Sequence, residues 1–408
     1  MPQFRSTYAM ACAAQPEFPV YCLRPAAVTT ATRWFIDNFP GRTLFAVKTN
    51  PYFVPTVAAA GLKHFDVASI AEIEDVARQV PGARMSFMHP VKSRLSIRRA
   101  YFEFGIRDFS LDCEAELEKI LEETRGAQDL NLFVRLKVSN RHSCMSLAGK
   151  FGVTDAAASR LLLRTRQAAD ELGICFHAGS QLMRPEAYVE AMEEVANQIR
   201  RSGVIIDILD VGGGFPSVYP HSSPPPLADF VNAINTVFET MPVSETCELW
   251  CEPGRALVAE AASLVVRVEL RKGNALYIND GVFGGLFDAG QPQFIYPTQV
   301  LKPKSQLSGS LQEFNFFGPT CDSADYMPGP FLLPANIDEG DYIEIGGLGA
   351  YSMQLRTEFN GFYQKELVEV TDGPLLSMYG IARAQEPVAA NSPLPQQQWD
   401  QDQLPGEN

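Results

Sequence analysis

From Arg42 to Glu252 the chain repeats one pattern: a short apolar run, a polar or glycine-containing turn, and a stretch with helical period. The apolar runs are Leu44–Lys48, His64–Ala68, Met85–His89, Asp108–Leu111, Leu130–Val138, Ile174–Gly179, Ile206–Val211 and Glu248–Glu252. The stretches between them, such as EAELEKILEETR, place apolar residues three or four positions apart, as one buried helix face requires. Eight strands alternating with helices predict an α/β fold of the (β/α)8 TIM-barrel type.

After Glu252 the pattern changes. The segments ALYINDGVFGG, QFIYPTQVL and DYIEIGG alternate β-branched or aromatic residues with polar ones and contain Gly and Pro. We therefore expect the barrel at residues 25–264 and a mostly-β domain at 265–383. The N-terminal segment 1–24, with its apolar YCL run, should join the β domain. Residues 384–408 are rich in Pro and Gln without apolar periodicity, which predicts a disordered tail.

Composition narrows the function classes. A chain of 408 residues is long enough for two domains. Its net charge of -14 argues against nucleic acid or an anionic membrane as the partner and is compatible with a small cationic ligand. The eight cysteines form no C-x-x-C pair, so neither a zinc site nor a disulfide framework is indicated. No apolar stretch marks secretion or membrane insertion, and we expect a cytoplasmic location.

The residues suited to chemistry fall where barrel strands should end, at the rim that carries the active site in TIM barrels. They are Lys48, Asp66, Arg135, His177, Ser180, Gly212, Gly213, Gly214 and Glu252. Lys48 ends the first apolar run, where partial desolvation can lower the pKa of its amine and allow it to form a Schiff base. A solvated lysine, a buried histidine and a glycine turn are the ordinary alternatives for single residues, but their convergence on one rim favours a site.

Seven motifs occur in order between residues 45 and 362: FAVKTNP, FDVAS followed by Glu72, HAGSQL, DVGGGFPS, CEPGRALVA, GPTCDSADYM and GAYSMQLRTEFNGF. They resemble the motifs of the fold-type III pyridoxal-phosphate decarboxylases, above all the eukaryotic-type ornithine decarboxylase group. The resemblance implies a TIM barrel plus a β domain and pyridoxal 5'-phosphate as the cofactor. It also implies a homodimer in which each active site is completed by the β domain of the partner.

The resemblance assigns roles to most of these residues and places Arg135 at the rim of the active site without a derived role. Lys48 would bind the cofactor covalently, His177 would stack on its ring, and Asp66 and Glu72 would order these two side chains. Glu252 would pair with the pyridine nitrogen, because a buried carboxylate favours the protonated ring, which is the electron sink for decarboxylation. The phosphate would be held by Ser180, Gly212, Gly213, Gly214, Gly254, Arg255 and Tyr351. Glycines suit this role because no Cβ keeps their N–H groups from the anion.

Two β-domain residues complete the implied site. Cys321 resembles the thiol that returns a proton to the substrate's Cα, and Asp322 resembles the carboxylate that receives its distal ammonium. The ornithine enzymes carry a second substrate aspartate downstream of the NDGV motif. Here Asp288 is the nearest candidate, several residues too early, and Phe283 stands where a tyrosine is common. Ornithine, converted to putrescine for polyamine biosynthesis, is the first substrate expected; lysine or both is the second, and another diamino acid the third.

Three alternative functions are compatible with parts of the sequence. An antizyme-inhibitor-like protein would keep the fold without catalysis, but Lys48, Glu252, Cys321 and Asp322 are all present. An alanine-racemase-like enzyme would share the barrel and the lysine, but the HAGS and GPTCD strings disfavour it. A metal-dependent barrel hydrolase would need histidines clustered at strand ends, and only His177 matches such a position, so no metal site is predicted.

Overall fold

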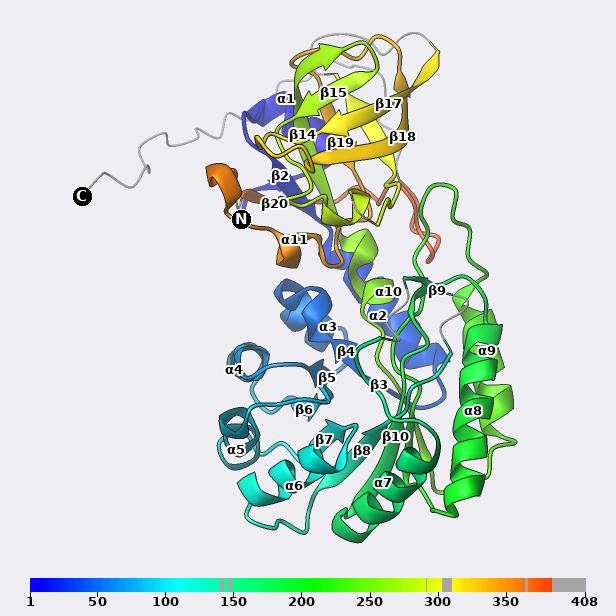
Figure 1. Cartoon of the computed structure of the whole chain (residues 1–408). Coiled ribbons are helices and arrows are strands. Elements are labelled where there is room, and N and C mark those ends of the chain that lie inside the picture. The colour runs from blue at the N-terminus through cyan, green and yellow to red at the C-terminus, as the bar shows by residue number, and fades with distance from the viewer. Residues whose placement is uncertain (140–142, 146–148, 291, 303–309, 364–365, 384–408) are drawn as a thin grey trace, which may run out of the picture.

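The computed structural model describes residues 1–139, 143–145, 149–290, 292–302, 310–363 and 366–383. The disorder predicted for 384–408 lies outside these residues. A ring of strands and helices forms the lower part of the molecule in Figure 1, and a mostly-β part stands above it. The fold class predicted from the sequence, a TIM barrel plus a mostly-β part, is confirmed.

The lower part is a parallel sheet of order β3-β13-β12-β10-β8-β7-β6-β5-β4. Its strands are β3 (Arg42–Thr43), β4 (Phe45–Ala46), β5 (His64–Val67), β6 (Arg84–Phe87), β7 (Asp108–Leu111), β8 (Asn131–Arg135), β10 (Glu171–Cys175), β12 (Ile208–Asp210) and β13 (Glu248–Cys251). Only Leu44 separates β3, which pairs with β13, from β4, which pairs with β5. These two short strands therefore act as one and close the eight-membered ring.

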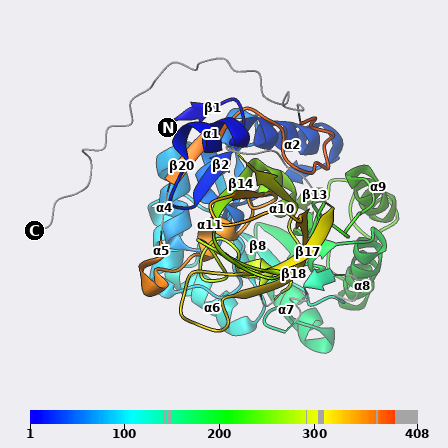
Figure 2. The ribbon, with the colours of Figure 1, turned by 90° about the horizontal axis from the view of Figure 1, so that it is seen from above.

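Helices surround the ring, as the view from above shows (Figure 2). They are α2 (Pro25–Asn38), α3 (Val54–Ala59), α4 (Ile70–Gln79), α5 (Arg94–Phe102), α6 (Glu114–Glu123), α7 (Asp155–Ala168), α8 (Glu186–Ser202), α9 (Leu227–Phe238) and α10 (Arg255–Val258). In α8, Tyr188, Met192, Val195 and Ile199 are buried at helical spacing, so one face packs on the strands. Gly203 caps the C-terminal end of the helix, and its φ of 67° is the left-handed conformation that glycine adopts at little cost.

The upper sheet has the order β1-β20-β2-β14-β15-β17-β18, with β19 pairing with β14 and β16. Its strands are β1 (Gln3–Phe4), β2 (Val20–Leu23), β14 (Ala262–Lys272), β15 (Ala275–Ile278), β16 (Thr298–Leu301), β17 (Leu311–Phe317), β18 (Tyr326–Pro334), β19 (Tyr342–Ile345) and β20 (Glu366–Val370). Helices α1 (Thr7–Ala14) and α11 (Ser352–Leu355) accompany it, and β9 (Ser143–Met145) with β11 (Ser180–Leu182) form a separate ladder. The YCL run lies in β2, which pairs with β14 and β20.

Most of the barrel strands end earlier than the apolar runs predicted for them. The first run does not reach Lys48, because β4 ends at Ala46 and the lysine lies in a 3-10 turn, η1 (Val47–Thr49). β8 ends at Arg135, three residues earlier than predicted. β10 begins at Glu171 and ends at Cys175, because its pairing with β8 fixes Glu171 opposite Asn131. His177 therefore follows its strand by two residues and is carried by a loop.

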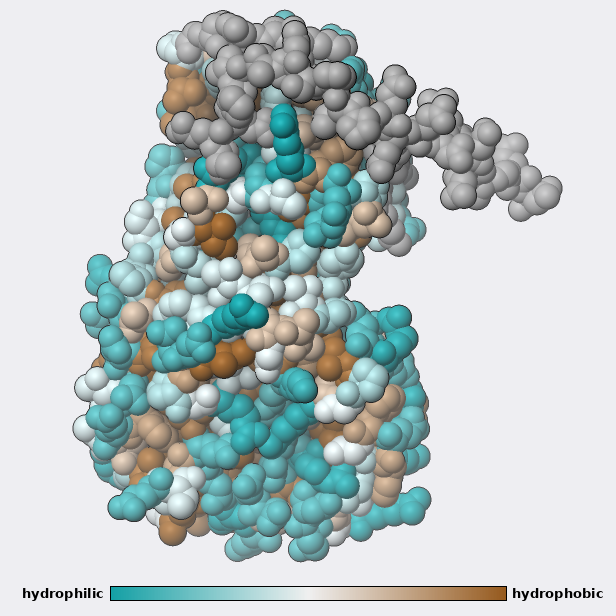
Figure 3. Space-filling view, turned by 180° about the vertical axis from the view of Figure 1, so that it is seen from behind, coloured by the Kyte–Doolittle hydropathy of each residue, from teal (hydrophilic) through white to brown (hydrophobic). Residues whose placement is uncertain are grey.

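No helix in the described part of the chain is long and apolar enough to cross a membrane. Seen from behind, hydrophilic residues cover much of the barrel surface, and the apolar patches between them are small and separate (Figure 3).

Candidate active site

One pocket at the C-terminal ends of the barrel strands collects most of the predicted residues. It is lined by Ala46, Lys48, His177, Ser180, Gly213, Gly214, Phe215, Glu252, Gly254, Arg255 and Tyr351. The pocket lies between the barrel and the β part, and the backbone N–H of Tyr351 donates a 2.8 Å hydrogen bond to the carbonyl of Thr49 beside Lys48. Barrel closure and this contact bring together residues that lie far apart in the sequence.

Lys48 faces this pocket and is held by a carboxylate. Its Nζ donates to Oδ2 of buried Asp66, at the end of β5, over 3.0 Å. Burial disfavours the ammonium, but the negative charges of Asp66 and Glu252 outweigh burial and raise the pKa of Lys48. The predicted lowering of this pKa was wrong, because the run around Lys48 does not reveal the carboxylates that the barrel places beside it. Lys48 must therefore lose a proton before it acts as a nucleophile.

Glu252 presents an unpaired oxygen. It directly follows β13, its carboxyl is buried, and Oε1 has no hydrogen-bond donor among the described residues. Burial and the neighbouring charge of Asp210 raise the pKa of Glu252 well above its usual range. A buried, unpaired carboxyl is costly unless a ligand supplies a partner.

Asp210, at the end of β12, was missed by the sequence analysis. It is fully buried, its Oδ1 accepts from the N–H of Gly212 over 2.8 Å, and burial raises its pKa to about 6. Asp210 and Glu252 are close enough to share a hydrogen bond when one of them is protonated. The available signal was an aspartate at a strand end, two residues before three consecutive glycines.

In the glycine loop, Gly212–Gly214, all three carbonyl oxygens are hydrogen-bonded, whereas two N–H groups remain available to a ligand. The carbonyl oxygens of Gly212, Gly213 and Gly214 accept hydrogen bonds from Glu252 N–H, Tyr188 OH and Leu182 N–H, respectively. Within the described residues, the N–H groups of Gly213 and Gly214 have no acceptor. Gly214 has a φ of 112°, and a Cβ there would lie 2.5 Å from the carbonyl oxygen of Gly179. Only glycine fits this turn, which leaves two donors for an anion.

Arg255 supplies the charge beside these donors. It is buried, its Nη1 donates to Tyr219 OH over 3.0 Å, and its Nε and Nη2 have no hydrogen-bond acceptor among the described residues. Its guanidinium carbon lies 5.2 Å from the ring centre of Tyr351. An enclosed guanidinium with unused donors is suited to a phosphate.

His177 is held as a neutral ring. Its Nδ1 accepts from the N–H of Gly179 over 3.1 Å, so the neutral imidazole carries its proton on Nε2. Burial and the charges of Arg135 and Lys48 lower its pKa well below the usual range. Glu72 instead caps the start of α4, because its Oε2 accepts from the N–H of Ala68 over 2.7 Å.

The donor set fits pyridoxal phosphate. The unpaired Glu252 oxygen suits a pyridinium N–H, the free N–H groups of Gly213, Gly214 and Arg255 suit a phosphate, and the Lys48 amine suits an aldehyde. Comparison with known sequences agrees, since residues 26–259 match the pyridoxal-dependent decarboxylases in their pyridoxal binding domain. The chain belongs to this family. Its cofactor is pyridoxal 5'-phosphate.

Relatives of this family align over most of the chain. A lysine/ornithine decarboxylase of Selenomonas ruminantium is 31% identical, over 81% of this chain and 84% of its own length. Antizyme inhibitor 2 of Xenopus laevis is 30% identical, over 79% of this chain and 74% of its own length. The crystal structure of lysine/ornithine decarboxylase from Vibrio vulnificus in complex with cadaverine superposes with a TM-score of 0.76 at 29% identity, covering 90% of this chain and 100% of that one.

Cys321 and Asp322 lie elsewhere on the chain, in the loop between β17 and β18. Cys321 is exposed, and its Sγ lies 3.2 Å from Oδ1 of Asn360. Oδ1 of Asp322 accepts from the N–H of Ala324 over 2.9 Å, which is the turn-capping contact of a surface aspartate. Neither residue is among those that line the Lys48 pocket. Asp322 instead lines a separate pocket of about 600 Å³ in the β part.

The remaining predicted residue, Asp288, lies beside Arg255. It is buried in a short 3-10 turn, η4 (Phe287–Ala289), and its Oδ2 lies 3.9 Å from Nη2 of Arg255. The structure therefore places Asp288 beside the guanidinium that lines the Lys48 pocket, and Asp288 is not among the residues that line the Asp322 pocket. Its assignment as a substrate residue stays a prediction.

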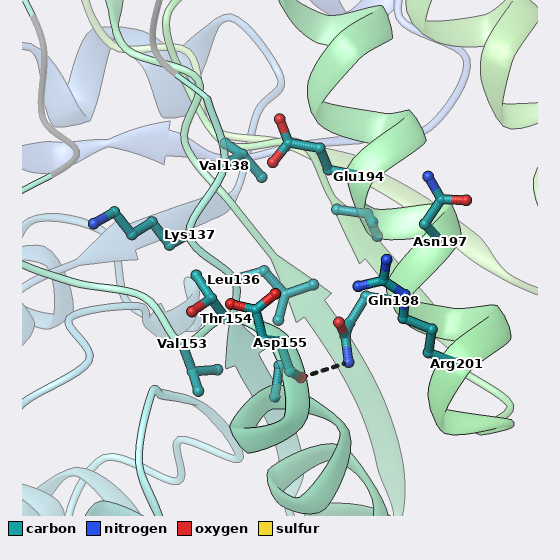
Figure 4. Close-up of a pocket in the computed structure, with 12 residues that line it drawn as sticks. Leu136, Lys137, Val138, Val153, Thr154, Asp155, Glu194, Asn197, Gln198 and Arg201 are labelled. Atoms are coloured by element: carbon teal, nitrogen blue, oxygen red, sulfur yellow. Dashed lines mark hydrogen bonds between the residues drawn. The ribbon is translucent and has the colours of Figure 1, made fainter.

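Another pocket lies on the outside of the barrel, between α7 and α8 (Figure 4). Its lining includes Lys137, Glu194 and Arg201, and Gln198 closes one side by donating to the carbonyl of Asp155 over 3.2 Å. It contains none of the predicted site residues and is separate from the candidate active site.

Proposed function

We propose that the chain decarboxylates a basic L-amino acid, with ornithine as the first candidate, lysine or both as the second and another diamino acid as the third. The observation that carries the proposal is the Lys48 pocket, where an amine, an unpaired buried carboxyl and a set of unused N–H donors meet. The relatives named for lysine and ornithine support a basic substrate.

The charge of the Asp322 pocket supports the same substrate class. Its ionisable side chains are Glu17, Glu269, Tyr277, Asp280, Asp322, Asp325, Arg356 and Tyr363. Five of these are carboxyl groups and one is a guanidinium, so the pocket favours a cationic group. Asp322 is the exposed carboxylate in the predicted substrate motif, and we assign it to the distal ammonium.

In this proposal pyridoxal phosphate, when bound, accepts the electron pair of the bond that releases carbon dioxide. Glu252 holds the ring nitrogen in its charged form from its buried position. Gly213, Gly214 and Arg255 fix the phosphate, with Ser180, Gly212, Gly254 and Tyr351 around it. His177 would cover one face of the ring, and Asp66 would hold the Lys48 amine in place. Cys321 returns a proton to Cα.

The position of Cys321 and Asp322 supports a site completed by two chains. They lie on an exposed loop away from the Lys48 pocket, so we propose a homodimer in which this loop reaches the pocket of the partner. Mixing inactive Lys48→Ala protein with inactive Cys321→Ala protein should restore about a quarter of the wild-type activity, since random pairing gives half mixed dimers, each with one intact site. Absence of any recovery in verified mixed dimers would contradict shared sites.

The decisive experiment incubates the purified protein and pyridoxal phosphate separately with ornithine, lysine, arginine and meso-diaminopimelate, followed by mass spectrometry. Putrescine or cadaverine identifies the preferred chain length. If the cofactor binds Lys48 but none of the four loses carbon dioxide, the substrate is another diamino acid. If the cofactor does not bind, the antizyme-inhibitor-like reading, which the similarity to antizyme inhibitor 2 keeps open, replaces catalysis.

A further inference from the structure

Three aromatic rings form a cage around the guanidinium of Arg255. Its guanidinium carbon lies 5.1 Å from the ring centre of Phe294, 5.2 Å from that of Tyr351 and 5.9 Å from that of Tyr219. Three rings exclude water from the guanidinium, so the few polar groups that touch it decide how it is oriented.

Those polar groups are Tyr219 and Asp288. Tyr219 OH accepts from Nη1 over 3.0 Å and is itself buried. Asp288 lies 3.9 Å from Nη2, beyond hydrogen-bond distance, so it supplies charge without occupying the donors. The Nε and Nη2 donors lie on one edge of the planar group, and neither has a hydrogen-bond acceptor among the described residues. A planar edge of two parallel N–H groups matches two oxygens of a phosphate.

Tyr219 is also tied to the glycine loop, five residues beyond Gly214 in the chain. Ser217, between them, exchanges two hydrogen bonds with Gln181, which fixes the path of the segment. One continuous segment thus carries both the backbone donors and the hydroxyl that holds Arg255.

We propose that Tyr219 is a positioning residue that directs the Nε and Nη2 edge of Arg255 toward the cofactor phosphate, with Asp288 as the buried counter-charge. The proposal rests on the proposed function, in which Arg255 binds that phosphate. By engaging Nη1, Tyr219 leaves the two-donor edge for the ligand. Without it, the guanidinium can rotate within its cage and present a different edge.

The test compares binding of the cofactor with binding of the same compound without its phosphate. Dissociation constants of the apoprotein for pyridoxal phosphate and for pyridoxal, which lacks the phosphate, are measured by the absorbance of the lysine-bound form. Tyr219→Phe should raise the dissociation constant for pyridoxal phosphate about 10- to 150-fold, the range for one hydrogen bond to a charged group, and leave that for pyridoxal unchanged. Tyr296→Phe is the matched control: its ring packs 5.8 Å from that of Tyr219, and its phenol makes no hydrogen bond to Arg255.

A double-mutant cycle shows whether Tyr219 acts through Arg255. If it does, adding Tyr219→Phe to Arg255→Lys weakens phosphate binding much less than adding it to the wild type. Equal losses in both backgrounds, or equal losses for pyridoxal and pyridoxal phosphate, would overturn the positioning role and indicate general damage to the fold. Failure of the wild type to bind either compound through Lys48 would instead overturn the proposed function.

Discussion

Replacing Glu252 by Gln tests the centre of the proposed chemistry. The substitution keeps the shape of the side chain and removes its ability to carry a negative charge opposite the ring nitrogen. The carboxyl is buried, and its Oε1 has no hydrogen-bond donor among the described residues, so this oxygen is available to the ring nitrogen.

The size of the effect follows from the kind of contact that is lost. A hydrogen bond to a charged group contributes about 1.5–3 kcal/mol. If this contact is made in the transition state for carbon dioxide loss, kcat/KM should fall about 10- to 150-fold, at about 1.4 kcal/mol for each factor of ten. Release of labelled carbon dioxide from each candidate substrate measures the rate, and the absorbance of the lysine-bound cofactor measures occupancy.

Glu260→Gln is the matched control. Glu260 is also buried, but its carboxylate accepts from Ser377 Oγ over 2.6 Å and from the N–H of Met378 over 2.5 Å, outside the pocket. This variant should retain the wild-type kcat/KM in the cofactor-loaded state. A Glu252→Gln enzyme that binds the cofactor and keeps its rate within threefold of wild type would refute the role assigned to Glu252.

Three further outcomes are expected. Lys48→Ala should abolish turnover and the absorbance of the lysine-bound cofactor; retained turnover would remove the lysine assignment. Asp322→Asn should raise KM for a cationic substrate about tenfold without changing cofactor affinity, as steady-state kinetics can show. Asp210→Asn should stabilise the apoprotein at neutral pH. The raised pKa of Asp210, about 6, means that the folded wild type loses stability as pH rises from about 4 through 6, and this loss should be smaller in the variant in unfolding titrations at each pH.

The sequence predicted the ring of strands because each strand repeats a local pattern of apolar residues. It placed Glu252 and the glycine loop correctly at strand ends for the same reason. The sequence prediction failed where a residue far away in the chain determines a strand boundary or a pKa. β10 starts at Glu171 because of its register with β8, and the pKa of Lys48 rises because Asp66 lies 3.0 Å away.

Asp210 and Tyr219 show a second limit. Asp210 is the first residue of the DVGGGFPS motif and Tyr219 follows that motif by two positions, but one looks like a strand residue and the other like a loop tyrosine. Their significance comes from contacts with Glu252 and Arg255, on a different strand end. A pattern reveals which residues a segment can bury, but it does not reveal the groups that will face them across a pocket.

Barrel closure explains why the pocket has two different ends. Pairing of β13 with β3 sets Cys251 opposite Thr43, which brings Glu252 beside the turn that carries Lys48. Arg255, three residues further on, begins α10 and meets the glycine loop that leaves β12, the other neighbour of β13. Carboxyl groups and an amine therefore gather on one side and N–H donors on the other. A ligand with a cationic ring nitrogen and an anionic phosphate has this same division of charge, so the strand order that closes the barrel also builds the cofactor site.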